Sequence, residues 1–295
     1  MSTVKRHQMV VFFGLAFVLP WSVWMTSVAQ AHDWISFHIP QALAFWLGLT
    51  IATYLAAGLS GGKAAIRDLV ARIVRWRVAP VWYVIAIGLP VLLGAAGVVL
   101  ARLTGHAVLI GDDLSRKMLL PVFLLEWWLF LLTEETAWRG FALPRLQRRY
   151  SPLVASLMLG ILWGLWHIPL FLIPGSFQSD LPFVGFLIST VATSITVSWI
   201  FNNARGSVLV CALFHATTDV SIGYLGVLSS GRVAFWLFVI AQCLVAVSLV
   251  AIQPNWWRQM APRDSRLVYP SLETAAEPSE DEGFGLPEGL AGERV

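Results

Sequence analysis

Eight apolar segments, each long enough to cross a lipid bilayer as a helix, constrain the fold of this 295-residue chain more than any other feature. A membrane-spanning helix needs about 20 predominantly apolar residues. The segments run over 8–30, 41–60, 79–101, 118–140, 153–173, 183–202, 206–226 and 233–252. Because the backbone must satisfy its own hydrogen bonds in lipid, each segment is predicted to be a helix. The sequence therefore predicts an all-α, polytopic membrane bundle of about eight transmembrane helices.

The composition indicates that lipid is the main solvent of this chain. Hydrophobic residues make up 57% and charged residues 13% of the sequence, and the mean hydropathy is +0.72. A soluble domain usually carries about 25% charged residues. The polar material is too scarce to cover a water-facing surface, so the net charge of +3 is not taken as a nucleic-acid signal, and no nucleic-acid partner is predicted.

Basic residues set the predicted orientation in the membrane. With the N-terminus in the cytoplasm, sixteen of the twenty Lys and Arg residues fall in cytoplasmic segments. This excess follows the positive-inside rule, so both termini are predicted to be cytoplasmic. The first apolar run is longer than the 7–15 residues of a signal peptide, which predicts a retained first helix. The compact loops and the charge pattern fit a bacterial plasma membrane.

Two further segments differ from the apolar runs: one is amphipathic and the other is a polar tail. Between 63 and 78, apolar residues recur at helical spacing opposite a basic face, which predicts an amphipathic helix on the inner leaflet. A cytoplasmic extension of a spanning helix is the alternative. The tail is rich in Pro, Glu, Gly and Ser, so we predict a transmembrane domain over 1–258 and a disordered cytoplasmic tail over 259–295.

Ionisable residues inside the apolar segments fall in three clusters, at 133–140, 163–167 and 215–219. An ionised side chain at the bilayer centre costs roughly 2.5–3.5 kcal/mol on insertion scales, so such residues usually face a protein interior and have a function. At a rise of 1.5 Å per residue, all three clusters lie roughly 13–20 Å from the cytoplasmic ends of their helices. We therefore expect the clusters to meet at one depth.

Spacing within the clusters predicts specific pairs. Glu135 and Arg139 are four residues apart on one helical face, where the guanidinium can pair with the carboxylate. Asp219 follows His215 by four residues and could orient its ring. Trp163, one turn before its neighbouring histidine, could form the floor of a pocket.

This environment is suited to hydrolysis by an activated water. In a low-dielectric site beside a guanidinium, Glu134 could act as a general base that removes a proton from water. One or both of His167 and His215, with Asp219, could then hydrogen-bond the oxyanion that forms when water attacks an amide. Glu126, higher on the same helix, is given no role by this pattern.

The three patterns EETAWRG, WGLWH and HATTD occur in this order between residues 134 and 219. In combination they resemble the CPBP family of intramembrane glutamic endopeptidases, which includes the CAAX prenyl proteases and the bacterial Abi-type proteins. That family has a Glu-Glu-x-x-x-Arg motif, an aromatic-x-x-x-His motif and a His-x-x-x-Asn/Asp motif on successive core helices.

The resemblance implies a membrane-embedded peptidase. The sequence has no His-Glu-x-x-His motif, so no metal cofactor is expected. The resemblance assigns water activation to Glu134, with Glu135, Arg139, His167, His215 and Asp219 in the supporting, oxyanion-binding and water-positioning roles. This chain departs from the commoner pattern in having Trp163 where Phe is usual and Asp219 where Asn is usual. The added negative charge of Asp219 could favour a cation.

Several alternatives stay open at this point. A zinc protease could use His167, His215 and a carboxylate, since three such ligands and a water suit catalytic zinc. Buried carboxylates and histidines also serve proton-coupled transporters, and an immunity-type binding partner is a further non-enzymatic possibility. For an enzyme, the expected substrate is a peptide or membrane protein, either prenylated or a peptide precursor, reached within the lipid bilayer.

Overall fold

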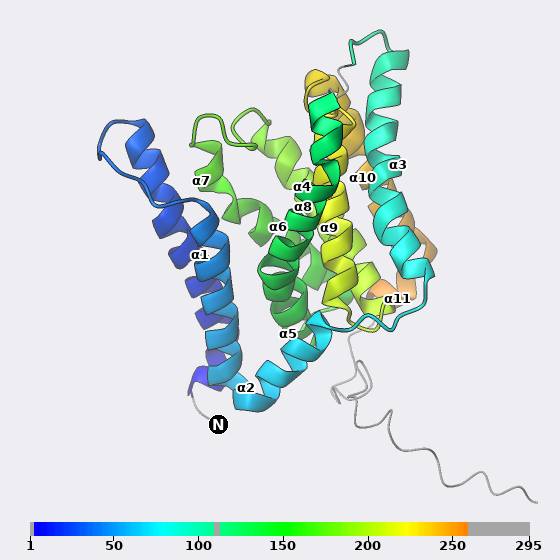
Figure 1. Ribbon diagram of the computed structural model, residues 1–295. Coiled ribbons are helices and arrows are strands. Elements are labelled where there is room, and N and C mark those ends of the chain that lie inside the picture. The colour runs from blue at the N-terminus through cyan, green and yellow to red at the C-terminus, as the bar shows by residue number, and fades with distance from the viewer. Residues whose placement is uncertain (1–2, 109–112, 259–295) are drawn as a thin grey trace, which may run out of the picture. The chain divides into compact units, whose positions relative to one another are not determined.

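The computed structural model describes residues 3–108 and 113–258, and every regular element in these ranges is a helix (Figure 1). The elements in chain order are α1 (Thr3–Ala31), the π-helix η1 (Ala44–Leu49), α2 (Thr50–Ile73), α3 (Val81–Leu103), α4 (Asp113–Leu132), the π-helix η2 (Thr136–Ala142), α5 (Leu143–Gln147), α6 (Pro152–Trp166), α7 (Ile168–Phe171), α8 (Phe183–Asn203), α9 (Val208–Tyr224), α10 (Gly231–Ile252) and α11 (Pro254–Arg258).

Five helical stretches of the described chain are long and apolar enough to cross a membrane. They are His7–Ala31, Ala44–Ile73, Val81–Leu103, Phe183–Asn203 and Gly231–Ile252, and two shorter apolar helices cover Pro152–Trp166 and Val208–Tyr224. The chain is therefore a multi-pass, all-α membrane protein, as predicted. The number of eight crossings and the cytoplasmic position of both termini stay predictions. The predicted disordered tail over 259–295 lies outside the described residues.

The predicted helix over 118–140 is not one continuous α-helix. The α-helix α4 ends at Leu132, and a π-helical turn, η2, begins at Thr136. The Thr136 hydroxyl donates a hydrogen bond of 2.5 Å to the Leu131 carbonyl, five residues earlier. Such π-turns are rare and often occur at functional sites. Here the turn follows directly on the glutamates of the first cluster.

The predicted helix over 153–173 is also interrupted. The helix α6 ends at Trp166, and His167 lies at the junction with the short helix α7. Pro169 explains the break, because proline has no backbone N–H to donate to the carbonyl four residues earlier and its ring clashes with that carbonyl. The interruption places His167 at a helix end.

The amphipathic segment is the second half of α2. The helix changes direction at Gly62, whose backbone has φ +61° and ψ −149°, and Figure 1 shows this bend. Beyond the bend Leu69 and Ile73 are buried, whereas Lys63 and Arg67 are exposed. The two faces are not cleanly separated, because Arg72 is buried and Val70 and Val74 are exposed. The location of this segment on the inner leaflet stays a prediction.

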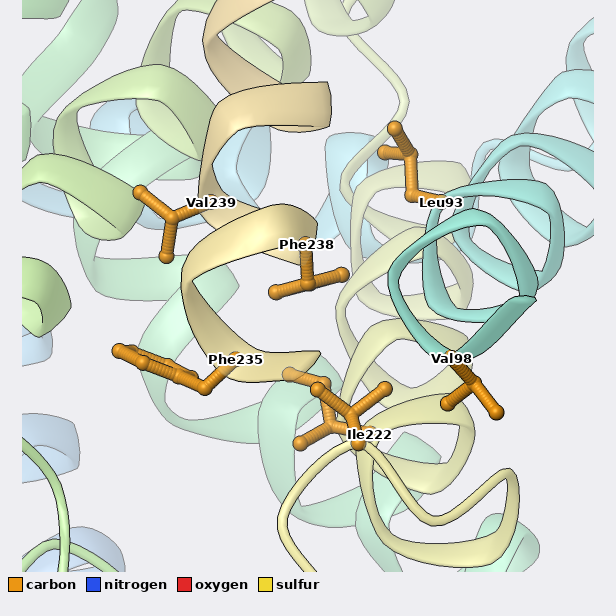
Figure 2. Packing of buried hydrophobic residues seen from close by; sticks show 7 residues of the cluster. Leu93, Val98, Ile222, Phe235, Phe238 and Val239 are labelled. Atoms are coloured by element: carbon orange, nitrogen blue, oxygen red, sulfur yellow. The ribbon is translucent and has the colours of Figure 1, made fainter. Parts of the chain in front are cut away.

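Two packing arrangements hold the site-bearing helices. The helices α3, α9 and α10 share an apolar cluster, part of which Figure 2 shows. Its buried members are Leu93, Val98, Ile222, Val227, Phe235, Phe238 and Val239. The second arrangement joins α6 to α8, where glycines allow close approach. A Cβ atom at Gly160 would lie 2.7 Å from the Cα of Val191, and one at Gly164 would lie 2.6 Å from the Thr190 hydroxyl oxygen.

Substituting Gly160 is expected to test this packing. Gly160→Ala should destabilise the protein by about 1–3 kcal/mol, because the new methyl group meets the backbone of α8 and overpacks the interface. Gly88→Ala is the matched control, since its new Cβ would have no neighbouring atom within 4 Å. Thermal unfolding in detergent should show a lower Tm for the first variant alone. Equal Tm values would contradict the packing account.

Candidate active site

The three clusters meet around one cavity of about 420 Å³, which we call the central cavity. Its acidic and histidine lining residues are Glu126, Glu134, His167, His215 and Asp219. They come from α4 and the turn after it, from the junction of α6 and α7, and from α9. The convergence that the helix depths predicted is therefore present in the structure. No described Lys or Arg lines the cavity.

Glu134 is almost completely buried, with 1% of its surface exposed. The indole nitrogen of Trp163 donates a hydrogen bond of 2.6 Å to Glu134 Oε2. The indole nitrogen of Trp138 donates to the same oxygen across 3.4 Å. Trp163 was expected to form the floor of a pocket. In the structure it also donates a hydrogen bond to the Glu134 carboxylate.

Glu135 is the centre of a buried ion-pair network. Its Oε1 accepts a hydrogen bond of 2.9 Å from Arg139 Nη1 and another of 2.9 Å from His215 Nδ1. The side chains of Glu135 and Arg139 have no exposed surface. The predicted pairing of these two residues is confirmed, and the network also joins the first cluster to the third.

Asp219 does not hold the His215 ring, as we had expected from their spacing on α9. The Nδ1 atom of that ring is bound by Glu135, which approaches from the segment between α4 and η2. A spacing of four within one helix allows a contact but does not exclude a better-placed partner from a neighbouring helix. Asp219 is half-buried and lines the central cavity.

The ring of His215 is fixed by two aromatic contacts. It stacks on Phe130, with the ring centroids 3.7 Å apart and the planes 1° from parallel. Trp163 meets it edge-on at 5.2 Å. Phe130 and Trp138 are site residues that the sequence analysis missed. Their spacing was the available signal, since they lie one helical turn before and one turn after Glu134.

His167 is oriented by a backbone carbonyl. Its Nδ1 lies 2.8 Å from the Trp163 carbonyl oxygen. A carbonyl oxygen only accepts, so Nδ1 carries the proton of this hydrogen bond. In the neutral ring, Nε2 is then an acceptor. The rings of Trp166 and Phe186 pack edge-on against this imidazole at 4.9 and 5.1 Å.

Glu126 lies on the same cavity, although the sequence analysis gave it no role. It is half-buried, and its Oε2 is a buried oxygen without a hydrogen-bond partner within the described ranges. With Asp219 it makes one side of the cavity acidic.

The zinc alternative requires three nitrogen or oxygen ligands around one point. Among the residues that the structure describes, no three His, Cys, Asp or Glu side chains are arranged to hold a metal ion. The described donors therefore do not fit a zinc site, and we derive no step through a metal. The expectation that the protein uses no metal cofactor stays a prediction.

The part of the chain that resembles known proteins contains the candidate site. Residues 116–221 match the family described as type II CAAX prenyl endopeptidase Rce1-like. Over this segment, the chain is similar to the Rce1-like family. The Rce1-like segment contains all three clusters and also Glu126 and Phe130.

A curated protein is also similar to part of this chain. The chain is 30% identical over 120 residues to a protein named CAAX prenyl protease 2 from Methanococcus maripaludis. The match covers 38% of this chain and 44% of the relative, so the chain spans less than half of that protein's length. Both matches agree with the resemblance read from the three motifs.

Proposed function

We propose that this protein is an intramembrane endopeptidase in which Glu134 activates a water molecule to hydrolyse a peptide bond. The observation that carries the proposal is the position of the Glu134 carboxylate. It is buried at a cavity that it shares with two histidines, and one of its oxygens accepts a short hydrogen bond. The match of residues 116–221 to the Rce1-like family supports the same reaction.

The proposed reaction has two proton transfers. Glu134 Oε1 takes a proton from a water molecule while the water oxygen attacks the carbonyl carbon of the scissile bond. The carbon–nitrogen bond of the resulting tetrahedral intermediate then breaks, and Glu134 returns the proton to the leaving amine. General acid–base catalysis of this kind contributes typically 10²–10⁴-fold to a rate.

The two histidines are suited to different parts of this reaction. His167 donates from Nδ1 to a backbone carbonyl, so neutral Nε2 can accept a hydrogen bond from the water and orient it. His215 donates from Nδ1 to the carboxylate of Glu135, which holds the ring in place as carboxylates do for working histidines. We propose that His215, with Asp219, stabilises the oxyanion.

The substrate and the setting belong to the same proposal. We propose a peptide or membrane-protein substrate that reaches the central cavity within the lipid bilayer, and a bacterial plasma membrane as the location. A prenylated C-terminal peptide is the substrate class favoured by the family description, and a peptide precursor is the other class considered.

The substrate class can be tested with the purified protein in liposomes. We expect it to cleave a peptide carrying a farnesylated cysteine near its C-terminus with a kcat/KM at least about tenfold above that of the same peptide without the lipid. The reason is that burying each CH₂ group of an isoprenoid contributes about 0.8 kcal/mol, and about 1.4 kcal/mol corresponds to a factor of ten.

The outcomes separate the parts of the proposal. Equal cleavage of the two peptides would reject a prenylated substrate and retain the peptidase. If neither peptide nor a transmembrane precursor peptide is cleaved by correctly folded protein, the proposed activity is contradicted.

A further inference from the structure

Trp163 contacts several of the candidate catalytic groups, which a residue that only forms the floor of a pocket need not do. Its indole N–H donates to Glu134, and its own carbonyl oxygen accepts from His167. The Arg139 guanidinium carbon lies 4.9 Å from the centroid of its ring. The edge contact with His215 completes the set. One buried residue therefore contacts groups from all three clusters, through its indole to Glu134, Arg139 and His215 and through its backbone carbonyl to His167.

The hydrogen bond to Glu134 distinguishes its two carboxylate oxygens. Oε2 accepts from Trp163 at 2.6 Å, a length typical of a strong hydrogen bond to a charged group. Oε1 has no hydrogen-bond partner within the described chain, and Glu134 lines the central cavity. The indole therefore orients the carboxylate with one oxygen engaged and the other left to act on water.

The location of Trp163 makes this orientation precise. It lies in the last turn of α6, one residue before Gly164 and three after Gly160. Those two glycines let α6 approach α8 so closely that a Cβ atom at either would meet α8 atoms at under 3.0 Å. The depth of the indole relative to Glu134 is thus set by rigid helix packing rather than by a loop.

We propose that Trp163 is a positioning residue for the general base, and that its N–H group, rather than its bulk, is what the reaction requires. The inference rests on the proposed function of Glu134. A phenylalanine at this position would keep an aromatic face for Arg139 and an edge for His215, but it has no N–H to donate to the carboxylate.

The test separates the N–H group from the ring. Trp163→Phe removes the donor and part of the ring. Incorporation of 3-benzothienylalanine at position 163 keeps the bicyclic shape and replaces N–H with sulfur. Both changes are expected to lower kcat by about 10- to 100-fold, the effect of losing one hydrogen bond to a charged group, with KM changed by less than about twofold.

Variants of two other tryptophans serve as controls. Trp257→Phe removes the indole N–H of another buried tryptophan, which donates a hydrogen bond of 2.9 Å to the Leu249 carbonyl away from the site, and it should leave kcat unchanged. Trp138→Phe removes the longer contact to Glu134 and should lower kcat only a few-fold.

The outcomes are distinguishable from a failure of the proposed function. Wild-type cleavage by Glu134→Gln would reject the role of the base itself. If Glu134→Gln is inactive while Trp163→Phe and the sulfur analogue keep kcat within twofold of the wild type, the positioning role is overturned. A loss with Trp163→Phe that the sulfur analogue does not share would assign the effect to ring packing and would also overturn it.

Discussion

Replacing Glu134 with glutamine is expected to lower kcat for peptide cleavage by at least about 10³-fold, within the range of general acid–base catalysis. Glutamine has nearly the same shape, and its carbonyl oxygen can still accept the hydrogen bond from the Trp163 indole. Its amide cannot take a proton from water at neutral pH. The loss is therefore expected in kcat, with substrate binding retained.

The measurement compares purified wild type and variant on a peptide that the wild type cleaves. Asp33→Asn is the matched control, because it makes the same change from carboxylate to amide at an exposed residue with φ +58°, a backbone conformation that asparagine tolerates. The control should keep wild-type activity. Retention of more than about a tenth of the activity by Glu134→Gln would contradict its role as the base.

Replacing Arg139 with leucine is expected to lower the free energy of unfolding by about 3–5 kcal/mol, the usual cost of removing one partner from a buried ion pair. Both side chains of the Arg139–Glu135 pair are fully buried, so Glu135 would keep a charge without its guanidinium. The guanidinium contact with the Trp163 ring would also be lost.

The double variant Glu135→Leu/Arg139→Leu distinguishes this explanation from simple loss of volume. Removing both charges together is often nearly neutral, so the double variant should be more stable than Arg139→Leu alone by at least about 2 kcal/mol. It should stay inactive, because His215 loses the acceptor of its Nδ1 proton. Denaturant unfolding in detergent measures the first effect. A double variant less stable than the single one would contradict the account.

The sequence alone predicted the helical segments and the convergence of three clusters. The apolar runs are unambiguous in lipid, because the backbone has no alternative to helix there. The spacing of Glu135 and Arg139 also predicted their ion pair correctly, since both residues lie on one local stretch of chain. The helices and the ion pair depend on local geometry, and the convergence depends on the depth of each cluster along its own helix.

The parts that sequence could not predict depend on how separate helices meet. His215 pairs with Glu135 rather than Asp219, although the sequence spacing favoured the latter. The stacking of Phe130 and the donation from Trp163 to Glu134 likewise cross between helices. The break near His167 could have been predicted from Pro169, which cannot donate a backbone hydrogen bond inside a helix, and the continuous helix over 153–173 was wrong for that reason.

The proposed peptidase activity depends above all on Glu134. The most direct measurement expresses wild type and Glu134→Gln at matched levels and compares new peptide termini across the membrane proteome by mass spectrometry. Some termini should occur with the wild type and be absent with the variant, and their sequences would name the substrate. Identical termini, with both proteins folded and inserted, would contradict the claim.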